Sequence, residues 1–313
     1  MRKKGIVTKS TGSWYEVMQD DRTFILCRLR GKFRLQGSKN TNPVVVGDRV
    51  EFVIEEDGSG YIIDIEKRKN YIDRKSTKLS KISHLIASNI DQAFLVVTLR
   101  EPRSSLGFID RFLVAAEGFR IPACLLFNKM DIYTEEEKLQ VCEWMEMYRK
   151  IGYQCIAASV ETGLGLEEIK EKMKDRVSLF SGHSGVGKSA IINALYPYLN
   201  LKIGEISSYH HKGKHTTTFA QMFPLENGGF IIDTPGIKEF GLIQYSKEEI
   251  RDYFPEIRQY NTCCRFRNCL HVHEPGCEVL KAVEEGILPS SRYLNYLAIL
   301  EDDDMKIPGW ELL

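Results

Sequence analysis

The chain carries two nucleotide-binding motifs in an order that excludes the usual layout of their domain. The first is Asn128-Lys129-Met130-Asp131, a sequence typical of loops that read guanine. The second is Gly182-His183-Ser184-Gly185-Val186-Gly187-Lys188-Ser189, a Gly-x-x-x-x-Gly-Lys-Ser phosphate loop. An ordinary guanine-nucleotide domain has the phosphate loop first. The reversed order predicts a circularly permuted domain, which a parallel sheet tolerates because its original termini can lie close together.

Around both motifs, apolar runs of strand length alternate with helix-like segments. The expected strands are 91–99, 123–127, 153–158, 177–181 and 230–233. The expected helices are 108–117, 134–151, 166–173 and 188–195. Such alternation indicates βαβ units and a mainly parallel sheet. We therefore predict a central α/β P-loop domain over residues 69–242.

The amino-terminal part has a different pattern, with short strands at 14–17, 23–29, 49–54 and 61–65 between turn sequences. About five strands in under 70 residues, without helical periodicity, favour a small closed barrel, and an OB-fold is the leading candidate over residues 1–68. The cationic side chains on and after the second of these strands are Arg28, Arg30, Lys32, Arg34 and Lys39. Phe33 and Tyr61 could stack on bases, or they could belong to the core.

The phosphate loop follows an expected strand and opens an expected helix, which is the context in which this motif binds nucleotides. Its glycines let successive N–H groups point at phosphate oxygens, and the start of the helix adds partial positive charge. Lys188 is predicted to reach the β- and γ-phosphates, and the Ser189 hydroxyl to bind Mg²⁺. We expect the whole loop, with Ala190 after it, to contact the nucleotide.

Two later segments are expected to complete the phosphate end of the site. Asp233 ends an expected strand in the sequence Asp-Thr-Pro-Gly, so its carboxylate can hold Mg²⁺ through water while the Gly236 N–H faces the γ-phosphate. Between the loops, the run Lys-His-Thr-Thr-Thr at 214–218 predicts a switch segment with one threonine hydroxyl on Mg²⁺. Thr217 is our choice, and its neighbours Thr216 and Thr218 are alternatives.

The tetrapeptide at 128–131 predicts a preference for guanine. The Asp131 carboxylate can accept from guanine N1–H and N2–H₂, whereas adenine has no donor at either position. Asn128 is expected to tie loops together, and the stem of Lys129 to pack over the base. Ser159 and Val160 follow another expected strand and can offer a backbone N–H to guanine O6. A P-loop ATPase is therefore the weaker alternative.

A Cys/His cluster near the carboxyl end predicts a metal site. Four of the eight cysteines lie between positions 263 and 277. Cys264, Cys269, His271 and Cys277 form the pattern Cys-x₄-Cys-x-His-x₅-Cys, which suits one closed, structural Zn²⁺ site. Cys263 and His273 could substitute as ligands. Reduced, buried thiols are the alternative, disfavoured because the segment is too polar for a core. We predict a mostly helical zinc-binding domain over residues 243–313.

The formal net charge is zero, but it is unevenly distributed: residues 1–80 carry +6 and the remainder carries −6. A basic amino-terminal domain suggests a polyanionic partner such as RNA, with a solvated charged surface as the alternative. No signal-peptide core follows the first residues, and no apolar run is long enough to cross a bilayer. We expect a soluble, cytoplasmic protein without a membrane partner, and a monomer by default.

These motifs together resemble the RsgA (YjeQ/YloQ) family of circularly permuted GTPases over essentially the full length. The resemblance is carried by the sequences at 182–189, 214–218, 233–237 and 264–277. It implies an OB-fold, a permuted GTPase domain and a zinc-binding helical domain with ligands Cys264, Cys269, His271 and Cys277. It also implies that the protein binds the small (30S) ribosomal subunit and its rRNA, is stimulated by that subunit, and acts late in its maturation.

The residue that positions the attacking water is not identified by these motifs. Ile237 stands where many small GTPases carry a glutamine, and its side chain cannot hydrogen-bond to water; the family is similar in this respect. We therefore expect slow intrinsic turnover through Lys188 and Thr217, with further groups from the ribosome or from switch residues such as His215. The alternative is a nucleotide-gated rRNA-binding module in which hydrolysis to GDP is incidental.

Overall fold

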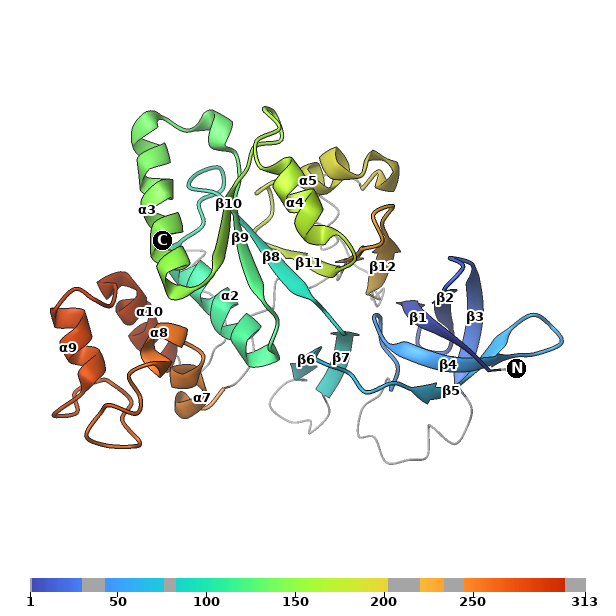
Figure 1. Cartoon of the computed structure of the whole chain (residues 1–313), viewed down its shortest axis with the longest axis horizontal. Coiled ribbons are helices and arrows are strands. Elements are labelled where there is room, and N and C mark those ends of the chain that lie inside the picture. Colours follow the sequence, from blue (N-terminus) through green and yellow to red (C-terminus); the bar gives the residue numbers. More distant parts are fainter. Residues whose placement is uncertain (1, 30–42, 76–82, 202–219, 234–244, 302–313) are drawn as a thin grey trace, which may run out of the picture. The chain divides into compact units, whose positions relative to one another are not determined.

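The computed structural model describes residues 2–29, 43–75, 83–201, 220–233 and 245–301 (Figure 1). The chain forms two compact units that are described separately below. The first comprises Met1–Ala93, Glu168–Phe180 and Ile192–Ile237, and the second comprises Phe94–Glu167, Ser181–Ile191 and Lys238–Leu313.

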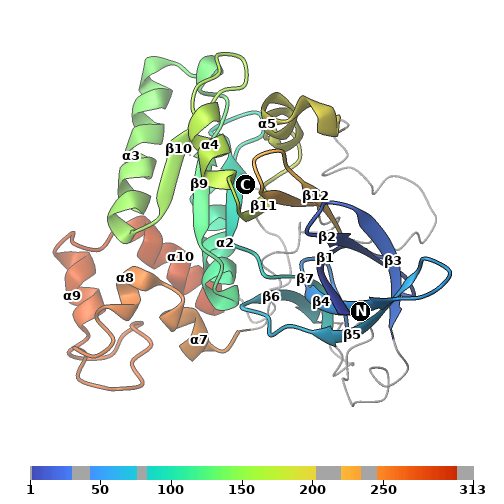
Figure 2. The same ribbon diagram turned by 45° about the vertical axis from the view of Figure 1, so that its right-hand side comes forward.

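The first unit contains the predicted barrel (Figure 2). Its strands are β1 (Arg2–Ser10), β2 (Tyr15–Gln19), β3 (Phe24–Leu29), β4 (Arg49–Ile54) and β5 (Gly60–Ile65). The order β1-β2-β3-β5-β4 closes through pairing of β1 with β4, and only β3 and β5 run parallel. Val7, Val17, Phe52 and Ile62 fill the centre and are fully buried. The closed barrel confirms the amino-terminal fold prediction.

β1 was missing from the sequence-based strands. Its first three residues, Arg2, Lys3 and Lys4, are exposed, and inward-facing side chains begin only near Val7. The apolar alternation that marks a strand is therefore limited to the second half of β1.

The rest of the first unit is a hairpin and a set of strands beside the barrel. β6 (Tyr71–Lys75) pairs with β7 (Ser83–Ser88). β11 (Val177–Ser181) runs parallel to β13 (Phe230–Asp233), and β12 (Gln221–Pro224) pairs with β13 in the opposite sense. A register pair between Lys9 and Gln221 joins β12 to β1. α4 (Leu166–Met173) lies mostly in this unit.

The second unit holds the sheet end that carries the guanine loop. β8 (Gln92–Val97), β9 (Ala123–Phe127) and β10 (Gln154–Ala157) lie in the order β10-β9-β8, with β9 and β10 parallel. α2 (Leu106–Phe119) follows β8, and the short helix η1 (Met130–Ile132) follows β9. α5 (Lys188–Leu195) starts in this unit and precedes η2 (Pro197–Leu199). The parallel strands and intervening helices confirm the predicted α/β architecture.

α3 (Glu135–Ile151) follows the guanine loop, and the sequence carries the signals that start and end this helix. Thr134 and Glu137 form a capping box, which satisfies free N–H groups at the first turn. Acidic residues follow in that turn and Arg149 and Lys150 lie in the last, both favourable for the helix dipole. Gly152 ends the helix with a φ of 114°.

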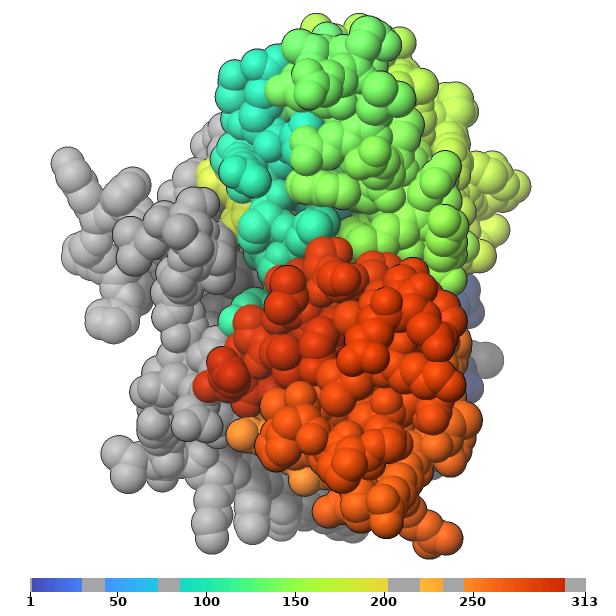
Figure 3. Space-filling view, turned by 90° about the vertical axis from the view of Figure 1, so that its left-hand side faces the viewer, coloured from blue at the N-terminus to red at the C-terminus, as the bar shows by residue number. Residues whose placement is uncertain are grey.

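The carboxyl-terminal part of the second unit, orange to red in Figure 3, consists of helices that Figure 1 draws as ribbons. Its helices are α7 (Lys247–Asp252), α8 (Pro255–Arg258), α9 (Glu278–Glu284) and α10 (Ser290–Glu301). Phe254, Val279 and Tyr296 are completely buried in their shared core, and α10 packs against α2. Among the helices that the structure describes, none has the length and apolar character needed to cross a membrane.

Candidate nucleotide and metal sites

The phosphate loop connects β11 to α5 through a backbone that only glycine adopts easily. Gly182, Gly185 and Gly187 have φ values of 135°, 84° and 99°. A Cβ on Gly182 would collide with the carbonyl oxygen of Val96, and one on Gly187 with the amide of Asn128. Both positive φ and the lack of space therefore require glycine at these two positions.

Lys188 and Ser189 lie at the inner side of this loop and are 6% and 7% exposed. The Lys188 ammonium donates to the carbonyl oxygens of Gly182 at 2.7 Å and His183 at 2.5 Å. These bonds hold a buried cation inside the curl of the loop, at the position from which a phosphate-binding lysine must act.

The His183 ring stacks on Phe108 of α2, with ring centroids 3.9 Å apart and an interplanar angle of 26°. α2 begins at its N-cap Ser105, whose side chain accepts from the Phe108 N–H. The sequence did not reveal this contact, because nothing in the spacing of positions 108 and 183 marks them as neighbours.

Asn128 joins the guanine loop to the phosphate loop. Its side chain is 2% exposed, and its Nδ2 donates to Val186 O at 2.8 Å. Tyr133 fixes the backbone of Asn128: its hydroxyl donates to Asn128 O at 2.9 Å and accepts from Leu99 N at 2.8 Å. Sequence reasoning missed Tyr133, whose position two residues after the motif was the available signal.

Asp131 is exposed, and one of its carboxylate oxygens accepts from the Ser159 hydroxyl at 2.5 Å. Ser159 is completely buried, and its Oγ also accepts from Thr162 N at 3.2 Å. The sequence suggested only a backbone role for Ser159 and Val160, whereas the structure shows the Ser159 side chain orienting Asp131. Lys129 adopts a left-handed conformation (φ 65°), and its ammonium donates to Glu101 O.

Several predicted site residues are not tested by this geometry. Thr217, His215 and Gly236 lie outside the described residues. Asp233 is the last residue of β13, as expected, but its side chain is also outside the described part. The structure thus brings the phosphate and guanine loops together, and all the Mg²⁺ ligands, Ser189 included, stay predictions.

The carboxyl-terminal cluster contains the four residues that the spacing selected. The potential ligand atoms of Cys264, Cys269, His271 and Cys277 all lie within 4.8 Å of one another. His271 Nδ1 lies 3.3 Å from Cys277 Sγ and 3.6 Å from Cys264 Sγ. A Zn²⁺ tetrahedron with bonds of about 2.3 Å has corners about 3.8 Å apart, so the cluster fits this ion. The alternatives Cys263 and His273 are exposed and outside the cluster.

The environment of the cluster favours the neutral imidazole that metals bind. Burial lowers the pKa of His271 to about 4, helped by the nearby cation Arg251. Burial also raises the pKa of the Cys269 thiol to about 12. Buried thiols of this kind need a cation before they ionise, and Zn²⁺ supplies one.

A phosphate loop and a guanine loop joined by one asparagine, on a parallel sheet, define a P-loop GTP hydrolase with a permuted chain. A sequence model of the RsgA GTPase matches residues 65–243, and one of the RsgA N-terminal domain matches residues 4–62. The chain belongs to the RsgA family of GTPases, and it is a GTP hydrolase.

Individual relatives and solved structures agree along the whole chain. The chain is 53% identical to the small ribosomal subunit biogenesis GTPase RsgA of Bacteroides fragilis, covering 96% of this chain and 97% of the relative. The protein of the same name from Christiangramia forsetii is 52% identical, covering 96% of both. The crystal structure of YjeQ from Thermotoga maritima matches with a TM-score of 0.80 at 38% identity, covering 96% of this chain and 98% of the YjeQ chain. YloQ, a circularly permuted GTPase, matches at 0.77 and 29% identity, covering 98% and 97%.

Proposed function

We propose that this protein hydrolyses GTP to GDP and phosphate on the small (30S) ribosomal subunit, late in its maturation, with stimulation by that subunit. The observation that carries the nucleotide part is the bond from Asn128 Nδ2 to Val186 O, because it holds base and phosphate loops at one site. The ribosomal part is supported by relatives of 53% and 52% identity that are named small ribosomal subunit biogenesis GTPases.

At the base end, the Asp131 carboxylate accepts from guanine N1–H and N2–H₂, and the Ser159 hydroxyl holds it in place. The backbone N–H of Val160 donates to guanine O6, because that of Ser159 already donates to Leu164 O at 3.0 Å. The Lys129 stem covers one face of the base while its ammonium is anchored on Glu101 O. The exposed position of Asp131 leaves its second oxygen accessible to the base.

At the phosphate end, the Lys188 ammonium leaves the carbonyl oxygens of the loop and binds the β- and γ-phosphates. The N–H groups of the loop donate to the oxygens of these phosphates. Ser189, Thr217 and Asp233 are the residues that would hold Mg²⁺, which supplies positive charge to the β- and γ-phosphate oxygens. The Gly236 N–H binds the γ-phosphate.

The barrel supports contact with rRNA. The Arg28 guanidinium lies 3.8 Å from the centre of the Trp14 ring, a pair that presents a cation on an aromatic face. Phe24 and Leu26, which alternate with buried residues along β3, are 50% and 55% exposed. A basic segment with exposed aromatic and aliphatic side chains suits single-stranded RNA. Because ribosomal subunits are its proposed partner, we propose that the protein acts in the cytoplasm; the monomeric state stays a prediction.

Purified small subunits are expected to raise the single-turnover rate of GTP hydrolysis by about 10³-fold or more, because groups supplied in trans have effects of this size in related GTPases. Large subunits are the matched control and should leave the rate unchanged. Lys188→Ala should remain slow with either subunit. Equal rates with small and large subunits would contradict the proposal. If subunit affinity changes between a non-hydrolysable GTP analogue and GDP while turnover is unaffected, the nucleotide-gated binding module is the better description.

We also propose that the Cys264–Cys269–His271–Cys277 cluster holds one structural Zn²⁺. The purified protein is expected to contain about one zinc per chain by elemental analysis, and Cys277→Ala to lose most of it, because the described residues add no fifth ligand to these four. Cys263→Ala removes a neighbouring but exposed thiol and should retain the zinc. Equal zinc content in the two variants would refute this ligand assignment.

A further inference from the structure

We infer that Asn261 and Asp252 are positioning residues that fix the tautomer of His271, so that the zinc ion is bound through Nδ1 rather than Nε2. This inference rests on the proposed zinc site. It concerns two residues outside the ligand set, one at the end of α7 and one in the loop that precedes Cys264.

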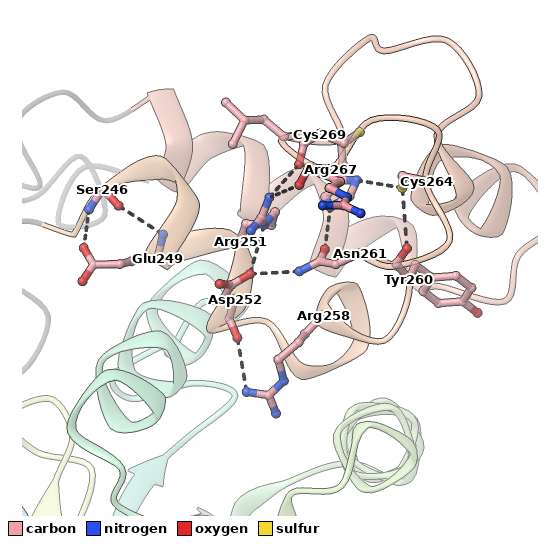
Figure 4. Close-up of polar contacts among 12 residues, drawn as sticks. Ser246, Glu249, Arg251, Asp252, Arg258, Tyr260, Asn261, Cys264, Arg267 and Cys269 are labelled. Atoms are coloured by element: carbon pink, nitrogen blue, oxygen red, sulfur yellow. Dashed lines mark hydrogen bonds and ion pairs between the residues drawn. The ribbon is translucent and has the colours of Figure 1, made fainter.

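A chain of hydrogen bonds determines which imidazole nitrogen carries the proton. An ionised carboxylate can only accept, so the Asn261 atom that lies 2.9 Å from Asp252 Oδ1 must be the donor Nδ2 (Figure 4). The Asn261 carbonyl oxygen then faces His271 Nε2 at 2.8 Å. Because this oxygen can only accept, Nε2 must carry the hydrogen.

The remaining nitrogen therefore offers its lone pair to the cysteines. His271 is fully buried, and its Nδ1 lies 3.3 Å from Cys277 Sγ and 3.6 Å from Cys264 Sγ. A half-turn of the ring would place carbon atoms against both Asn261 and the thiols, losing both sets of contacts. The ring orientation is thus determined at both ends.

The Asp252 side chain is itself held in place by the guanidinium of Arg251, which also bonds to the backbone of Cys269. Arg251 Nε donates to Asp252 Oδ1 at 3.0 Å, while Arg251 Nη1 donates to Cys269 O at 3.3 Å (Figure 4). One guanidinium therefore ties the end of α7 to the backbone of a ligand, and the Asp252 carboxylate cannot turn away from Asn261 without losing this bond.

The main chain at His271 is held in an unusual conformation by hydrogen bonds on both sides of the residue. His271 has a φ of 59°, in the left-handed region that a non-glycine residue rarely adopts. The Glu274 carboxylate accepts from the N–H groups of Leu270 at 2.7 Å and Val272 at 2.8 Å, on either side of it. The Tyr293 hydroxyl donates to His271 O at 2.8 Å. These bonds fix the main chain, while Asn261 fixes the ring.

The direct test is nuclear magnetic resonance of the imidazole nitrogens in the zinc-loaded full-length protein. Long-range proton–nitrogen correlations should show His271 Nδ1 bound to metal and Nε2 protonated. Zinc bound at Nε2 would overturn this inference and leave the zinc proposal intact. A protein that binds no zinc, or binds it without His271, would overturn both.

Variants measure how much the positioning contributes. Asn261→Ala is expected to weaken zinc binding by about 10–100-fold in competition with a chelator, the usual cost of removing such a partner. Asp252→Asn should cost less, because an amide there permits either orientation of Asn261. Asn268→Ala is the matched control, an exposed asparagine in the same loop that should keep the wild-type affinity. Wild-type affinity in Asn261→Ala would refute the role; if that variant does not fold, the resonances of the unaltered protein decide.

Discussion

Arg292→Ala is expected to lower the free energy of unfolding by about 3–5 kcal/mol, because it leaves buried carboxylates without their cation. Arg292 Nη1 donates to Asp110 Oδ1 at 2.5 Å, and its Nε donates to Glu256 Oε1 at 2.6 Å. Tyr148 and Asn295 also donate to Asp110, at 2.7 and 2.6 Å. Burial opposes the charge on Arg292, but the two carboxylates raise its pKa well above the ordinary value, so it stays ionised.

The measurement is urea unfolding followed by circular dichroism. Arg258→Ala is the matched control, because Arg258 also reaches α2, through Glu117 at 3.7 Å, but its side chain is 54% exposed. An exposed pair contributes about 0–1 kcal/mol. Similar small effects for both variants would mean that water or rearrangement compensates the buried carboxylates. Replacing Arg292 by Met together with Asp110 by Asn and Glu256 by Gln should cost less than Arg292→Ala alone, since neither partner position then keeps an unpaired charge.

This ion cluster also links the two candidate sites within one unit. Asp110 lies in the second turn of α2, and Arg292 belongs to α10, which packs against it. Near the start of the same helix, Phe108 stacks on His183 of the phosphate loop. α2 therefore contacts the phosphate loop at one end and the carboxyl-terminal helical segment along its length.

The sequence predicted the parts of the molecule that local patterns encode. The strands 123–127, 177–181 and 230–233 and the helices 166–173 and 188–195 begin and end where expected. The strands are apolar runs, and the helices lie between glycine, polar loops or motif residues, so the limits are visible in the sequence itself. The Cys and His residues that cluster in the structure were equally visible, because their spacing along the chain fits a metal-ligand pattern.

What the sequence could not predict depends on contacts between distant positions. Arg292 and Asp110 are 182 residues apart, and an arginine and an aspartate on helices are normally read as exposed charges. Asn261 lies ten positions before His271 and belongs to no ligand pattern. The Ser159 hydroxyl acts on Asp131 only because the loops after β9 and β10 meet at the same sheet edge.

Asp131→Asn is expected to lower GTP affinity by about 10²–10⁴-fold and to create a preference for xanthosine triphosphate. Each hydrogen bond to an ionised acceptor is worth about 1.5–3 kcal/mol, and two are altered on guanine. The structure indicates which amide orientation the variant takes. The Ser159 hydroxyl, which also accepts from Thr162 N, donates to Asp131 Oδ1. An asparagine at position 131 keeps its carbonyl oxygen at the Ser159 hydroxyl, because that hydroxyl donates. Its NH₂ group therefore replaces the second carboxylate oxygen and faces the base.

Because of that orientation, Asp131→Asn is expected to change the nucleotide specificity and not only to weaken nucleotide binding. Guanine presents an amino group to this NH₂, so donor meets donor, whereas xanthine presents a carbonyl oxygen in the same place. Affinities for the two triphosphates, measured by titration with fluorescent analogues, should therefore cross over. Glu136→Gln makes the same carboxylate-to-amide change at an exposed position of α3 and should alter neither affinity. Retained preference for GTP in Asp131→Asn would show that Asp131 does not contact the base. Equal weakening for both nucleotides would show that Ser159 does not hold the amide as the geometry requires.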